Sequence, residues 1–156
     1  MTIKRQDLVD AVDTRLKTIL TTAGYRTNIG ANVFQWREFA AISPSELPCI
    51  VFADRSETPE LVNAGRNSTQ KRTLTIEYEI IYTGTESKTI MTNLRKGQAD
   101  IEDAIRTDVK FGNLALWTKP AGTQLGLTDQ NTEDMTGILT GSFEIVYQTG
   151  FWNSEA

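Results

Sequence analysis

The sequence contains no histidine and only one cysteine among its 156 residues. The missing histidines exclude zinc sites with imidazole ligands, Ser-His-Asp and Cys-His nucleophile systems, and histidine-based pH switches. The single cysteine, Cys49, excludes an internal disulfide and thiolate metal clusters, and is typical of a protein from a reducing compartment. Composition alone therefore argues against most classes of enzyme.

Long apolar runs are also missing. None approaches the roughly 18 residues that would span a bilayer, and the charged residues 1–7 are not followed by the apolar core of a secretory signal. We therefore expect a soluble protein that is made in the cytosol and has no membrane partner. Cys49 itself stands in an apolar run, so we expect a small buried hydrophobe and not a reactive thiol.

The length and composition of the chain indicate a single domain. The chain is 39% hydrophobic and 23% charged, and its length is enough to bury a core without disulfides or metals. Residues 119–156 carry five acidic side chains against Lys119, so this segment accounts for the whole net charge of −4. No Lys/Arg patch with interleaved aromatic residues appears, so we do not expect tight nucleic-acid binding.

Hydrophobic periodicity predicts the secondary structure. Apolar residues at three- and four-residue intervals predict helices over 6–23, with Gly24 as the stop signal, and over 87–107. Alternating or continuous apolar runs predict strands over 33–38, 47–53, 71–83, 123–128 and 138–149, with a turn at Pro120 and Gly122. This order favours an α+β fold, with both helices on one face of a mainly antiparallel, mixed sheet. Between two of the strands, the polar residues 55–72 are predicted to form a long loop, which usually indicates a functional or mobile segment.

Three patterns in the sequence are similar to chemical sites, and each has a structural explanation. Residues 84–89 end in Lys-Thr like a phosphate-binding loop, but the glycine before the lysine is missing, so a strand-to-helix turn capped by Ser87 is favoured. Residues 129–134 have oxygen ligands at alternate positions, but Asp134 stands where a calcium loop needs glycine. Glu77 and Glu79 lie on one face of a predicted strand and could form an acid/base pair, but solvent-facing glutamates opposite an apolar face are the usual arrangement. No catalytic residue, metal ligand or cofactor is predicted.

Four segments carry a resemblance to a known family. They are residues 6–23 with Gly24-Tyr25, residues 29–34 (IGANVF), residues 46–52 (ELPCIVF), and residues 99–105 (ADIEDAI) before a closing strand. In layout and pattern the chain resembles the tail terminator proteins of long-tailed bacteriophages, the family that includes the lambda minor tail protein U. None of the four segments is a sharp motif.

The resemblance implies a non-enzymatic virion protein that is assembled in the host cytoplasm. It would form a homohexameric ring on the head-proximal end of the tail tube, stop tube polymerisation and offer a joining surface to the neck protein. Genomic DNA would pass through the ring without specific binding. A head-completion or stopper protein of the neck, and a small acidic binding module unrelated to virions, remain alternatives.

Two sets of candidate residues follow from this reading. The predicted loop would contact a neighbouring subunit or the tube protein, and its candidates are Arg55, Leu61, Val62, Arg66, Lys71 and Arg72. An acidic lumen would repel passing DNA, and the candidates to line it are Asp129, Glu133 and Asp134, with Glu77 and Glu79 as weaker members.

Overall fold

The computed structural model describes residues 3–62, 69–128 and 134–150. One five-stranded sheet has the strand order β1-β2-β3-β5-β4. β1 runs parallel to β2 and every other neighbouring pair is antiparallel, which confirms the predicted α+β class with a mixed sheet. The elements are α1 (Lys4–Leu16), β1 (Val33–Gln35), β2 (Cys49–Leu61), β3 (Thr69–Gly84), α2 (Ser87–Arg106), β4 (Trp117–Thr128) and β5 (Met135–Gly150).

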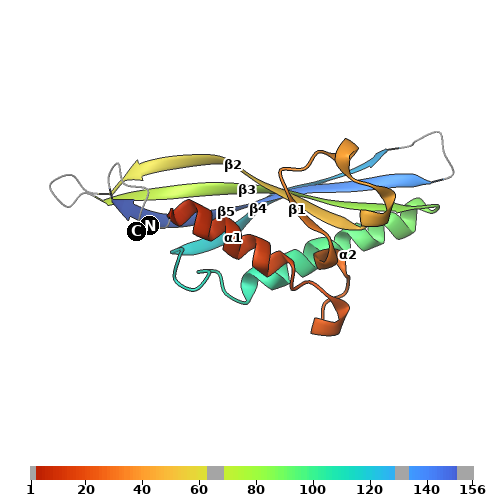
Figure 1. Ribbon diagram of the computed structural model, residues 1–156, viewed down its shortest axis with the longest axis horizontal. Coiled ribbons are helices and arrows are strands. Elements are labelled where there is room, and N and C mark those ends of the chain that lie inside the picture. The colour runs from red at the N-terminus through yellow and green to blue at the C-terminus, as the bar shows by residue number, and fades with distance from the viewer. Residues whose placement is uncertain (1–2, 63–68, 129–133, 151–156) are drawn as a thin grey trace.

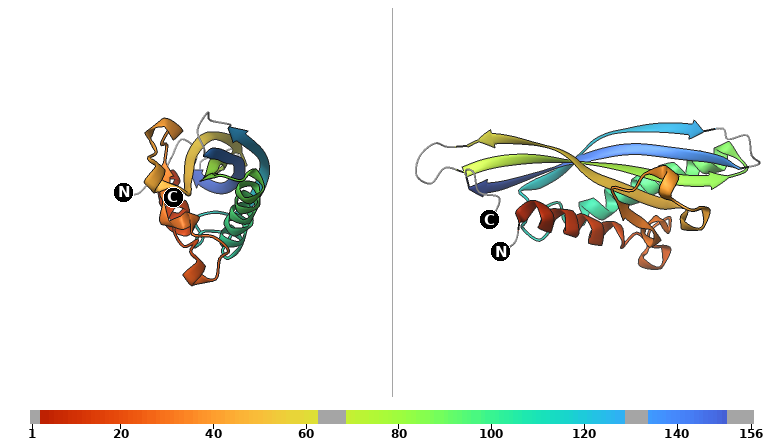
Figure 2. Two further views of the ribbon diagram at one scale, coloured as in Figure 1. Left: turned by 90° about the vertical axis from the view of Figure 1, so that its right-hand side faces the viewer. Right: turned by 45° about the horizontal axis from the view of Figure 1, so that its top comes forward.

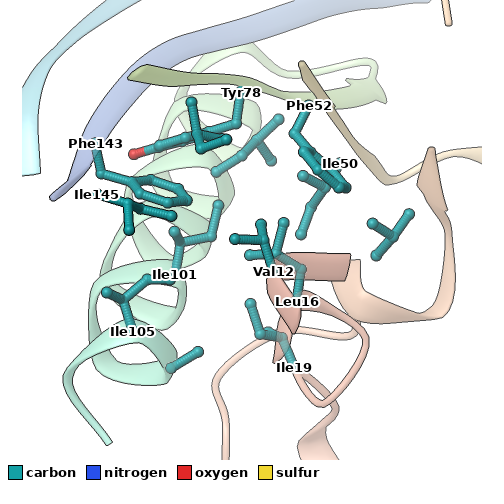
Figure 3. Close-up of a cluster of buried hydrophobic side chains, with 14 of the residues drawn as sticks. Val12, Leu16, Ile19, Ile50, Phe52, Tyr78, Ile101, Ile105, Phe143 and Ile145 are labelled. Atoms are coloured by element: carbon teal, nitrogen blue, oxygen red, sulfur yellow. The ribbon is translucent and has the colours of Figure 1, made fainter. Parts of the chain in front are cut away.

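Both helices cover the same face of the twisted sheet (Figures 1 and 2). Alternate residues of β3, among them Leu74, Ile76 and Ile80, point to this face and are fully buried, as their spacing predicts. Leu8, Val12 and Leu16 of α1 and Ile90, Leu94 and Ile101 of α2 pack into the same core. Figure 3 shows Val12, Leu16 and Ile101 within it. A second, smaller cluster of Cys49, Val51 and Ile81 lies on the other face, beneath Phe34, Ile42 and Leu47.

The first helix is shorter than its apolar pattern predicts. α1 ends at Leu16, and the Thr18 hydroxyl then donates to the Arg15 carbonyl at 2.6 Å. Ile19 stays fully buried although it lies outside the helix, because its carbonyl accepts the Gly30 N–H at 2.9 Å and is held against the next segment. Gly24, with φ 94°, ends a short 3-10 helix at Thr21–Ala23 and not α1.

The prediction of a loop over residues 55–72 is wrong for the described part of this range. Residues 55–61 belong to β2 and residues 69–72 to β3, and Ser56–Leu61 pairs with Gln70–Thr75. The polar composition is typical of a loop, but here β3 is held on its other side by β5, so the hairpin extends an existing ladder. The Val62 N–H donates to the Thr69 carbonyl, and hydrogen-bonded pairs alternate with non-bonded pairs along an antiparallel ladder. Residue 59 therefore stands in a non-bonded pair, and its backbone nitrogen points away from β3. Pro59 is tolerated there because this position needs no N–H.

The last two strands are longer than predicted. β4 begins at Trp117, and the Pro120–Gly122 segment is a shift of register within the strand instead of a turn. β4 is the outer strand of the sheet, where proline is tolerated because alternate N–H groups point away from the neighbouring strand. The helix predicted over 87–107 is confirmed as α2, but its N-cap is Glu86 and no side chain caps it, so the predicted cap at Ser87 is wrong.

Candidate assembly surfaces

The described residues hold no group of three or more cysteine, aspartate or glutamate side chains placed to bind a metal ion. Within the same ranges, no helix is long and apolar enough to cross a membrane. Cys49 is fully buried, and burial raises the pKa of its thiol to about 12, so at neutral pH it stays a protonated, inert thiol. The surfaces and the joints between elements therefore carry the functional interest of this chain.

One joint connects the fourth of the four segments singled out in the sequence, residues 99–105, to the turn between the first and the second. Asp100 of α2 is a fully buried carboxylate that accepts hydrogen bonds from the backbone N–H of Arg26 (3.1 Å) and of Thr27 (2.8 Å). The Thr27 hydroxyl (2.7 Å) and the Arg26 guanidinium (3.0 Å) complete its shell. The fourth segment therefore holds the turn that connects the first segment to the second.

The remaining contacts between these segments are backbone contacts. A Cβ at Gly30 would lie 2.6 Å from the Leu16 carbonyl oxygen and 2.7 Å from that of Ile19, so the second segment packs on the first at a distance that only glycine permits. β1, in the second segment, pairs with β2, in the third, from Val33↔Ile50 to Gln35↔Phe52. The four segments thus form one connected framework, although they are far apart in the sequence.

The predicted interface residues on the hairpin have different environments. Leu61 and Val62 are 49% and 53% exposed at its end, as an interface requires. Arg55 is exposed at the register shift of β2, where its guanidinium pairs with Glu77 at 3.2 Å and lies over the Trp36 ring. Lys71 is half-buried in β3. Arg66 lies outside the described residues.

Arg72 does not present a free charge to a partner. It pairs with Glu57 at 2.9 Å and donates to the Thr149 hydroxyl at 3.1 Å. Glu57 also accepts a hydrogen bond from the Tyr147 hydroxyl, and its carboxylate lies 3.9 Å from the guanidinium of Arg5 in α1. Burial and the bond to Glu57 raise the pKa of Tyr147. This cluster locks the hairpin to α1 and β5, and sequence analysis missed it because its members lie up to about 140 positions apart.

The predicted acidic residues do not form one cluster. Glu77 and Glu79 lie in mid-strand on the face of the sheet opposite the helices, and Glu77 is neutralised by Arg55. Asp134 is exposed and directly precedes β5. Five ladder pairs separate Glu79↔Thr140 from Gly84↔Met135, a distance of about 17 Å at 3.3 Å per residue. Asp129 and Glu133 lie outside the described residues.

Glu77 and Glu79 line a cavity of about 760 Å³, which we call the outer-face groove. One wall is the segment Trp36–Phe39, and the floor is the sheet at Val51, Ala53, Ile138 and Thr140. Trp36 is 55% exposed and has a φ of 55°, which is rare for a bulky residue. Its indole N–H donates to Asp54 at 2.8 Å. This aromatic side chain is therefore both accessible and fixed.

A second hollow, of about 270 Å³, lies between α2 and β4. Ile101 and Ile105 of α2 line it together with Pro120 of β4 and Phe143 of β5. Further along β4, Leu125 and Leu127 are 42% and 43% exposed on the side of the sheet that α2 covers. They remain exposed because α2 packs over β3 and β5 and leaves the outer strand uncovered.

Comparison with known proteins gives little further information about this chain. No protein-family model matches it, and no curated protein matches its sequence. Among the solved structures that match, one is a chain from the virion of a native gene transfer agent particle, with 14% sequence identity and a TM-score of 0.40. The match covers 88% of this chain and 92% of that one. A likeness at this level carries no argument about function.

Proposed function

We propose that this chain is a structural virion protein that forms a ring at the head-proximal end of a phage tail tube. As a tail terminator it stops tube polymerisation and offers a joining surface to the neck. The observation that carries this proposal is the framework described above: the four segments with the family resemblance are joined through Asp100, Gly30 and the β1–β2 ladder.

The distribution of exposed apolar side chains supports assembly into a ring. Leu125 and Leu127 lie on the outer strand β4, whereas Trp36 and Phe39 lie beside β1, at the opposite end of the strand order. Two different surfaces on opposite sides of a subunit favour head-to-tail contacts, and such contacts close into rings when the rotation permits. A protein that paired only through one surface would need only one such patch.

The hairpin and the acidic segment have separate roles in this proposal. Leu61 and Val62, exposed at the hairpin end, contact the tube protein or a neighbouring subunit. Six chains at −4 each give the ring a net charge of −24, and like charge in the lumen lets DNA pass without being held. Asp134 stays a lumen candidate with the acidic residues 129 and 133, whereas Glu77, already paired with Arg55, adds no net charge.

The test is a tail-tube polymerisation assay. Purified chain is added to growing tubes of its cognate tube protein, and tube length and end structure are recorded by negative-stain electron microscopy. We expect shorter tubes with a ring at one end only. Binding to isolated neck complexes and not to tubes would indicate a head-completion protein instead. A chain that stays monomeric and leaves tube length unchanged would contradict any role in the ring.

A further inference from the structure

The outer-face groove has an excess of negative charge. Arg37 and Arg55 on its lining are paired with Glu46 and Glu77 at 3.0 and 3.2 Å. Glu38 and Glu79 also line it, and neither forms an ion pair with any described residue. Two uncompensated carboxylates beside the exposed Trp36 and Phe39 make a site for a surface that is both apolar and basic.

Trp36 has the properties of an anchor residue for such a surface. Its backbone N–H donates to the Phe52 carbonyl at 2.9 Å, its indole N–H donates to Asp54, and the Arg55 guanidinium lies 4.8 Å from its ring centre. A side chain held in this way loses little conformational entropy when a partner covers it. Exposed tryptophans of this kind contribute disproportionately to binding energy at protein interfaces.

A basic and apolar surface exists on the same chain. From Ser87 to Ala99, α2 contains Lys88, Arg95 and Lys96 and no carboxylate, and none of these three cations forms an ion pair with a described residue. Lys88 is the second residue of α2, where a positive charge opposes the helix dipole. The helix would be more stable without a cation there, which suggests that its partner lies outside the subunit.

Two of these cations, Lys88 and Arg95, lie on the β4 side of α2. Positions 88, 91, 95, 98 and 102 follow helical spacing along one side of α2, and Glu102 lines the hollow that α2 forms with β4. At the other end of this side, Leu127 pairs with Gly137, over which Ile90 and Leu94 pack. We define the α2–β4 surface as Lys88, Met91, Arg95, Leu125 and Leu127.

We propose that the α2–β4 surface of one subunit docks into the outer-face groove of the next, with Lys88 and Arg95 facing Glu38 and Glu79. The occupant is a second copy of this chain because the two surfaces are opposite in charge and both carry exposed apolar side chains. They lie on opposite faces of one sheet, the groove over β2, β3 and β5 and the α2–β4 surface at the outer strand, so each subunit uses both surfaces, with a different neighbour at each. This inference rests on the proposed ring and moves Glu79 from the lumen to the contact between subunits.

The experiment is a charge swap between two variants. The groove variant is Glu38→Lys with Glu79→Lys, and the helix variant is Lys88→Glu with Arg95→Glu. Asp10→Lys on α1 and Lys110→Glu after α2 are matched controls, since both residues are exposed and lie outside the two surfaces. Assembly is measured by sedimentation velocity over a concentration series at low and high salt, and circular dichroism confirms that each variant is folded.

We expect each swapped variant alone to need at least about tenfold more protein to assemble than the wild type, with the controls unchanged. An equimolar mixture should assemble again, because every contact then joins opposite charges. The mixture also excludes misfolding as the cause, which matters for the half-buried Glu79. High salt should weaken assembly of the wild type. If either swapped variant alone assembles at the same protein concentration as the wild type, the proposal is overturned.

A second measurement covers a chain that assembles weakly. Carbodiimide coupling of wild-type protein at high concentration should join Lys88 to Glu38 or Glu79 between subunits, as identified by mass spectrometry of mixed isotope-labelled and unlabelled chains. Absence of both assembly and this cross-link would refute the contact. Loss of DNA retention by the helix variant with unchanged assembly would assign the cations to nucleic acid instead. If the swapped variants still cap tubes, this contact is refuted and the proposed function is left intact. If the wild type assembles through this contact but does not cap tubes, the proposed function is refuted and the contact is left intact.

Discussion

Asp100 offers the sharpest test of how the chain is held together. Its buried carboxylate accepts four hydrogen bonds, two from backbone N–H groups, one from the Thr27 hydroxyl and one from the Arg26 guanidinium. Asp100→Ala removes the acceptor but leaves the backbone N–H and the hydroxyl of the buried Thr27 in place. The buried N–H and hydroxyl of Thr27 each lose their acceptor at a cost of about 1–3 kcal/mol. We therefore expect a loss of about 2–6 kcal/mol, a large share of the 5–15 kcal/mol that stabilises a typical domain.

The loss is measured by urea and thermal unfolding followed by far-UV circular dichroism. For a domain of this size 1 kcal/mol corresponds to about 2–4 °C, so the Tm of Asp100→Ala should fall by about 4–24 °C. Asp103→Ala is the matched control, because Asp103 binds the same Arg26 at 2.8 Å but is partly exposed, where water screens the pair. If Asp103→Ala destabilises the chain as much as Asp100→Ala does, the buried carboxylate is not the joint that we describe.

Three further predictions follow from the structure. Gly30→Ala places a Cβ within 3 Å of three backbone atoms and should cost about 1–3 kcal/mol of unfolding free energy, whereas Gly126→Ala, with its nearest neighbour at 3.9 Å, is the tolerated control in the same urea titration. The free energy of unfolding should be constant between pH 5.5 and 8, since there is no histidine. It should fall in acid, because hydrogen bonds from Trp36 and Arg5 outweigh the effect of burial and lower the pKa of Asp54. The stability that ionised Asp54 contributes is therefore present above its ordinary pKa of 3.8 and is lost as the pH falls through the folded value. Burial raises the pKa of Cys49 from 9.0 to about 12, so the stability that its protonated thiol contributes is lost as the pH rises from about 9 to 12. At pH 8 a thiol reagent should label Cys49 only at the rate of unfolding, and rapid labelling of the native protein would contradict its burial.

The extent of correct prediction differs between elements for a physical reason. α2 and β3 were predicted within two residues of their observed ends, because one side of each packs on the core and imposes its period on the sequence. The hairpin half of β2 was missed because Ser56, Thr58 and Glu60 carry no such period. They are strand residues only because β3 lies beside them. Likewise, Pro120 and Gly122 are typical of a turn. They belong to a strand here because they pair with β5 at the outer edge of the sheet, and only the tertiary structure shows this pairing.

Local pattern by itself determined the α+β class, the shared core face of both helices, the burial of Cys49 and the lack of a histidine- or thiolate-based site. Each of these depends on composition or on residues a few positions apart. The tertiary structure alone decided which charges are paired and which are free. Arg72 is neutralised by Glu57 and Glu77 by Arg55, whereas Lys88, Arg95 and Glu79 form no ion pair with the part of the chain that the structure describes. Charge pairing depends on distances of a few ångströms between residues far apart in the chain, and folding sets those distances after every strand has found its neighbour.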